Sequence, residues 1–216
     1  MSLDAHFHCW QLARGDYGWL TPALAPIYRD VAVDDWQAQS APHGVTGGVL
    51  VQAAPTEAET AFLLAQADAH PCVLGVVGWV DLAASDAPAR IERLARHPRL
   101  KGLRPMLQDL PDAEWILQPA IAPALQAMAD CHLVFDALVK PVHLPHLLTL
   151  AGRHPDLRIV IDHAGKPDIA AAQWQPWADG MARLASQTGA WCKLSGLLTE
   201  AGPAPAPGVV QPWAAH

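Results

Sequence analysis

The chain has 216 residues, of which 51% are hydrophobic and 16% charged, with a formal net charge of −7. This length is enough for one large buried core and is in the range of a single α/β barrel. The acidic balance and the lack of any Lys/Arg run argue against binding to nucleic acid or to an anionic membrane surface, and no segment reaches the roughly 20 uninterrupted apolar residues of a membrane span.

The first predicted strand, residues 3–8, carries a His-x-His pair, His6 and His8. Side chains two positions apart on a strand project from the same face, so both imidazoles are expected to point the same way. Such a pair can share a divalent metal or polarise a substrate oxygen. A chance pair on a half-exposed strand is the structural alternative. The pair becomes informative only together with the rest of the chain.

Short apolar runs then alternate with helical patterns along the chain. Six further strands are predicted, at residues 48–53, 73–80, 100–106, 132–139, 157–162 and 190–195. Helices are predicted between them at 56–70, 87–97, 119–130, 143–154 and 174–188, the first opened by a capping box of Thr56 and Glu59. This alternation predicts a (β/α) architecture, either a barrel or a doubly wound sheet.

Two other segments stand outside this alternation. Residues 14–29 are too long and irregular for a plain connection, and we predict a flap over the carboxyl end of the first strand. Residues 209–216 follow a Pro-rich linker and are predicted to begin a helix.

Polar residues collect where the predicted strands end, which is where (β/α) folds place their chemistry. Taken singly, each has a structural explanation: Arg104 could anchor a loop, Asp136 could cap a helix, and Lys193 could extend its charge to solvent. Their convergence on one rim favours a functional site. Besides the two histidines, the set comprises Gln52, Trp79, Asp81, Lys101, Arg104, Gln108, Asp136, Asp162, His163, Lys166, Lys193, Ser195 and Glu200.

Other chemistries find little support. The sequence has no Gly-x-Ser-x-Gly elbow, no Gly-x-Gly-x-x-Gly and no Walker loop. Cys9 is conceivable as a nucleophile, but a buried cysteine acting as a small hydrophobe is the commoner case. The four cysteines are widely spaced and no secretory signal is present, so reduced thiols and a cytoplasmic location are expected.

The motifs together resemble the amidohydrolase superfamily, in particular its fuconolactonase-like branch of sugar-acid lactonases. The strongest carrier is the run Asp-His-Ala-Gly-Lys-Pro at 162–167. The others are Asp-Ala-His-Phe-His at 4–8, Val-Gln-Ala at 51–53, Gly-Trp-Val-Asp at 78–81, Lys-Gly-Leu-Arg at 101–104, Leu-Gln-Asp at 107–109 and Cys-Lys-Leu-Ser-Gly at 192–196.

The resemblance implies a (β/α)8 TIM barrel of the metal-dependent hydrolase type that opens a lactone or a related carbonyl compound. It implies that His6, His8 and His163 surround the reacting carbonyl and are the ligands of a divalent metal such as zinc, if one is used, since some relatives work without a metal. The expected partner is a small molecule, a lactone or carboxylic acid. Substrate-binding groups are expected at Gln52, Trp79, Arg104, Gln108, Asp136 and Lys166.

The chain departs from the family pattern at its end. The water-activating aspartate of the family stands on strand eight in a Gly-Ser-Asp-Trp-Pro-like run, which residues 1–216 lack. We therefore expect a single barrel domain over residues 1–216 with about seven βα units, incomplete at the C-terminus and poorly active unless another segment supplies strand eight. Two alternatives stay open: a metal-dependent decarboxylase of the same superfamily, and a non-catalytic truncated barrel that binds a small anion or a partner.

Overall fold

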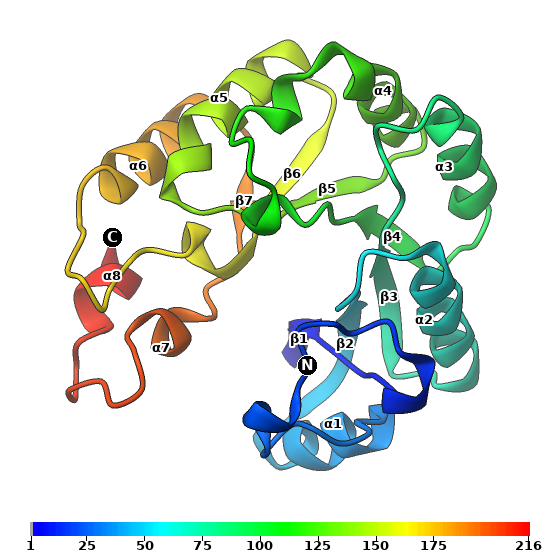
Figure 1. The fold of residues 1–216 in the computed structure, drawn as a ribbon, viewed down its shortest axis with the longest axis horizontal. Coiled ribbons are helices and arrows are strands. Elements are labelled where there is room, and N and C mark those ends of the chain that lie inside the picture. Colours follow the sequence, from blue (N-terminus) through cyan, green and yellow to red (C-terminus); the bar gives the residue numbers. More distant parts are fainter. Residues whose placement is uncertain (1) are drawn as a thin grey trace. The chain divides into compact units, whose positions relative to one another are not determined.

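A computed structural model describes residues 2–216. The chain divides into two compact units, both built from parallel strands and helices (Figure 1). The first unit comprises Met1–Asp81 and Ala89–Arg104, and the second comprises Leu82–Pro88 and Pro105–His216.

The first unit holds four parallel strands that neighbour one another in chain order. They are β1 (Ser2–Phe7), β2 (Val45–Val51), β3 (Val73–Gly78) and β4 (Leu100–Leu103). The helices between them are α1 (Val33–Ser40), α2 (Glu57–Ala69) and α3 (Ala87–Ala95), whose first residues belong to the second unit.

The second unit holds three parallel strands, also in chain order: β5 (Val134–Ala137), β6 (Arg158–Ile161) and β7 (Trp191–Cys192). Helices α4 (Ala122–Asp130), α5 (Leu144–Arg153) and α6 (Trp177–Gln187) lie along one side of this sheet (Figure 1). Two short helices follow, α7 (Leu197–Glu200) and α8 (Gln211–Ala215).

The predicted alternation of strands and helices is confirmed. Strands β1 and β2 begin and end earlier in the chain than predicted, and β3 to β7 are shorter than predicted. The helix predicted at the C-terminal stretch is confirmed as α8. Helix α1 was missed, because Val33 is its only buried residue and it has no continuous apolar stripe.

Helix α2 packs closely against the end of β3 because a glycine gives it room. A Cβ atom on Gly78 would lie 2.5 Å from Cγ2 of Thr60. The Thr60 hydroxyl accepts a hydrogen bond from the main-chain nitrogen of Trp79 at 2.8 Å and donates to its carbonyl at 2.9 Å. The helix is thereby fixed to the carboxyl end of β3.

Glu59 fixes the end of β2 in a similar way. The capping box is only half formed: Thr56 Oγ1 accepts from the main-chain nitrogen of Glu59 at 3.0 Å. The Glu59 carboxylate turns inward instead, accepting from the nitrogen of Ala53 at 3.0 Å and from the nitrogen of Ala54. Burial raises the pKa of this carboxyl above 4.5, against the lowering effect of the two amides.

Within residues 2–216, every helix is too short or too polar to cross a lipid bilayer. Within the described residues the four cysteines form no disulfide, and burial raises the pKa of the Cys9 thiol to about 12, which makes it a poor nucleophile.

Replacing Gly78 with Ala is expected to lower the free energy of unfolding by about 1–3 kcal/mol, because the added methyl group overlaps Thr60. Gly152→Ala is the matched control, since a Cβ there meets nothing within 4 Å. Urea unfolding of both variants measures the difference. Equal stability of the two would contradict the close approach of α2 to β3.

Glu59→Gln is expected to remove a pH dependence of stability. A carboxyl whose pKa is raised on folding binds more protons in the folded state, so its contribution to stability falls as pH rises above about 4.5. As pH rises from 4 to about 8, the free energy of unfolding of the wild type should therefore decrease relative to that of the variant. The neighbouring Glu57→Gln is the matched control, because this carboxylate is part-exposed and pairs with Arg90 instead of with main-chain amides.

Candidate active site

The two histidines of the first motif lie side by side at the end of β1, as predicted. Their Nε2 atoms are 3.1 Å apart and their ring centroids 4.8 Å apart. Nδ1 of His8 lies 2.7 Å from the carbonyl of Val51, and its Nε2 atom faces Nε2 of His6. Both rings are half-buried, which leaves them accessible to a small ligand.

Arg104, at the end of β4, extends its guanidinium to this pair. Nη1 of Arg104 lies 3.3 Å from Nε2 of His6, and Nη2 donates to the carbonyl of Gln52. The Gln52 amide in turn donates to the Arg104 carbonyl at 2.8 Å, and both side chains are almost fully buried. The ends of β1, β2 and β4 therefore place two imidazoles and one guanidinium at a common point.

The irregular segment predicted as a flap packs against the loop after β2. Trp19 donates its indole hydrogen to the carbonyl of Ala53 at 2.8 Å, and Trp10 and Tyr17 join a buried apolar cluster with Ala53 and Ala54. The segment follows the first strand, as expected, but its contacts are with the residues beside Gln52.

In the second unit, a left-handed turn after β6 presents His163. His163, Ala164 and Lys166 have φ values of 53°, 52° and 50°, a conformation that costs non-glycine residues of order 1–2 kcal/mol each. The turn is held by the indole of Trp177, which donates to the Ala164 carbonyl at 2.7 Å. Nδ1 of His163 is 2.9 Å from the hydroxyl of Ser195, which fixes the direction of the ring.

A buried ion-pair cluster lies beside this turn. The Lys193 ammonium is 2.6 Å from Asp136 at the end of β5 and 2.9 Å from Asp162 at the end of β6. The side chains of Lys193, Asp136 and Asp162 are only 10%, 2% and 0% exposed. Burial and the Asp162 carboxylate raise the pKa of Asp136, so one ammonium compensates the two acids only in part.

The other predicted substrate-binding residues lie outside these clusters of contacts. Trp79 is held by its main chain to Thr60, and its side chain is half-buried. Gln108 lies in a 3-10 turn, where its carbonyl accepts from Lys140. Lys166 forms an ion pair with Glu200 at 2.9 Å.

The donor atoms in each unit have chemistry that suits zinc. Two nitrogen ligands of a tetrahedral zinc ion lie about 3.3 Å apart, close to the 3.1 Å between His6 and His8. In the second unit, a carboxylate oxygen of Asp162 and a ring nitrogen of His163 lie within 4.8 Å of each other. The residues present therefore fit a divalent ion, although Arg104 and Lys193 already place positive charge beside both sets.

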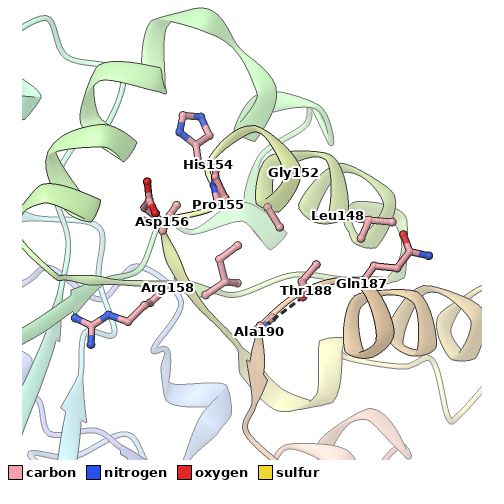
Figure 2. Close-up of a pocket in the computed structure, with 13 residues that line it drawn as sticks. Leu148, Gly152, His154, Pro155, Asp156, Arg158, Gln187, Thr188 and Ala190 are labelled. Atoms are coloured by element: carbon pink, nitrogen blue, oxygen red, sulfur yellow. Dashed lines mark hydrogen bonds between the residues drawn. The ribbon is translucent and has the colours of Figure 1, made fainter.

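A cavity of about 550 Å³ lies at the opposite ends of the strands in the second unit (Figure 2). It is bounded by the last turns of α5 and α6 and by the residues that lead into β6 and β7. Of the described residues, none of those predicted for the site lines this cavity. Its lining includes His154, Asp156, Arg158, Gln187 and Thr188.

Two residues have structural roles that the sequence did not reveal. Considered alone, Lys193 was predicted to extend its ammonium group to solvent, whereas the side chain is buried between two acids. Glu59 was interpreted as a helix cap, whereas it holds the loop that contains Gln52. The available signal for Lys193 was the presence of Asp136 and Asp162 at the ends of neighbouring strands.

Comparison with known proteins agrees with the motifs. The Amidohydrolase family model matches residues 3–215. An L-fucono-1,5-lactonase of Burkholderia ambifaria is 51% identical over 203 residues, which are 94% of this chain and 70% of the relative. A second L-fucono-1,5-lactonase, from Burkholderia multivorans, is 34% identical over 212 residues and covers 93% of this chain and 70% of the relative.

Among solved structures, an amidohydrolase from Burkholderia multivorans with bound zinc superimposes with a TM-score of 0.85 at 32% identity. The match covers 92% of this chain and 70% of that one. Because the family model spans nearly the whole sequence and the strands follow one another in the family's order, the chain belongs to the amidohydrolase family and has its (β/α)-barrel type of fold, of which residues 2–216 supply seven parallel strands.

Proposed function

We propose that the protein is a hydrolase that opens a sugar-acid 1,5-lactone by attack of water on the ring carbonyl. The observation that carries the proposal is the convergence of His6, His8 and Arg104 at the end of β1, in a chain 51% identical to an L-fucono-1,5-lactonase. Four cysteines that form no disulfide among the described residues favour a reducing compartment, and we include a cytoplasmic location in the proposal.

The chemistry needs groups that stabilise negative charge on the carbonyl oxygen. When water adds to the carbonyl carbon, the oxygen becomes an oxyanion; the bond to the ring oxygen then breaks and leaves a hydroxy acid. Ring N–H groups and a guanidinium are suitable donors for that oxyanion. We assign this role to His6, His8 and His163, with Arg104 orienting the pair from a fixed position.

Recognition of a polyhydroxylated ring needs donors and acceptors around the reacting carbonyl. Gln52, Trp79, Gln108 and Lys166 remain our proposals for contacts with substrate hydroxyls and with the acid product. Asp136 is proposed to act together with Lys193, because its carboxylate is engaged in that ion pair.

A divalent metal would be held by His6, His8 and His163, and when bound it would supply Lewis acidity to the carbonyl.

The proposal is tested by incubating the purified chain with a series of six-carbon aldono-1,5-lactones, including L-fucono-1,5-lactone, and following acid release with a pH indicator. Calorimetric titration with the corresponding sugar acids measures binding separately from turnover. We expect acid release above the spontaneous rate, with micromolar to millimolar affinity for the acids. The proposal fails if the chain neither accelerates hydrolysis nor binds any of these acids, and release of carbon dioxide from an aromatic acid would favour a decarboxylase.

Arg104→Lys is expected to weaken sugar-acid binding and kcat/KM for the lactone by about 10- to 100-fold. The ammonium cannot reproduce the paired contacts of the guanidinium with Gln52 and His6. Arg93→Lys is the matched control, because Arg93 is 63% exposed and pairs only loosely with Glu57 at 3.6 Å. Circular dichroism establishes that both variants fold. Unchanged binding in folded Arg104→Lys would remove Arg104 from the site.

A further inference from the structure

A buried lysine side chain lies beside potential metal ligands in the second unit. Lys193 leaves the end of β7 and reaches the carboxylates at the ends of β5 and β6, at 2.6 Å and 2.9 Å. Asp162, one of those carboxylates, is adjacent in sequence to His163 and shares a potential ligand set with it. The Asp162 carboxylate is thus both a partner of the ammonium and a potential metal ligand.

The net charge of the Lys193, Asp136 and Asp162 side chains determines whether a divalent metal ion can bind among them. With both carboxylates ionised, the one ammonium leaves at most a single net negative charge in a nearly water-free environment. A zinc ion bound to Asp162 at about 2 Å would lie within about 5 Å of the Lys193 ammonium and would leave the cluster positive. Without the ammonium, a divalent ion would balance the two carboxylates completely.

We propose that Lys193 is the resident cation of the Asp136–Asp162 pair and that its charge keeps divalent metal ions from the Asp162 carboxylate. Replacing it with a neutral side chain would convert Asp136, Asp162 and His163 into a divalent-metal site. Lys193 is thereby a determinant of how far this chain depends on metal, a role distinct from contact with substrate.

A purely structural role makes a different prediction. If Lys193 only ties three strand ends together, its loss lowers stability, as removal of one partner from a buried ion pair does, but metal ions do not restore it. If the Lys193 ammonium instead occupies the position that a metal ion could take, zinc restores the stability that a neutral variant loses. Binding of zinc to the folded state raises the unfolding temperature of that variant.

The experiment compares wild type with Lys193→Met in calorimetric zinc titrations and in thermal unfolding with and without zinc. We expect Lys193→Met to bind zinc at least about tenfold more tightly than wild type and to gain more thermal stability from it. The exposed Lys140→Met in the same unit is the control and should behave like wild type. Zinc affinities of wild type and Lys193→Met within twofold of each other would overturn the proposal.

Two additional variants keep the test decisive. Adding Asp162→Asn to Lys193→Met should abolish the gain in zinc affinity, which separates this site from zinc held elsewhere. If Lys193→Met does not fold, Asp136→Asn answers the same question, since it keeps the ammonium and removes one acid. It should bind zinc more weakly than wild type, and undiminished affinity would contradict the proposal. No lactone is present, so the outcome is independent of hydrolysis.

Discussion

Charged side chains buried at the carboxyl ends of parallel strands constrain everything else in this chain. A charge taken out of water must be paired or hydrogen-bonded. In the first unit, Arg104 meets this condition by bonding the Gln52 carbonyl and approaching His6. In the second, Lys193 meets it between Asp136 and Asp162. Each cation therefore holds the polar groups around it in one arrangement.

The main chain next to these groups is held equally firmly. The Glu59 carboxylate binds two consecutive amides after Gln52, the Thr60 hydroxyl binds both polar groups of Trp79, and the Trp177 indole holds the strained turn at Ala164. These anchors come from helices that cover the sheets. Such support keeps catalytic donors in place without reorganisation during the reaction, which is the physical basis of electrostatic stabilisation.

Local pattern predicted the elements and the strand-end residues, because short continuous apolar runs and the polar residues that follow them are visible in a single sequence. The His6–His8 pair also followed from local geometry, since both side chains leave one strand on one face. Lys193 and Glu59 could not be assigned this way. The role of Lys193 depends on partners 57 and 31 residues away in the sequence, and that of Glu59 depends on the amides of a loop. Helix α1 was not predicted, because Val33 is its only buried residue and its sequence shows no apolar stripe.

The central claim is that His6, His8 and His163 act on one substrate carbonyl. Nitrogen NMR of the protein with ¹⁵N-labelled histidine, titrated with the sugar acid released from L-fucono-1,5-lactone, tests it most directly. The ring nitrogens of these three histidines should shift together with a single dissociation constant, while those of the other histidines stay in place. Shifts confined to histidines outside this set, or separate dissociation constants for the pair on β1 and for His163, would contradict a shared site.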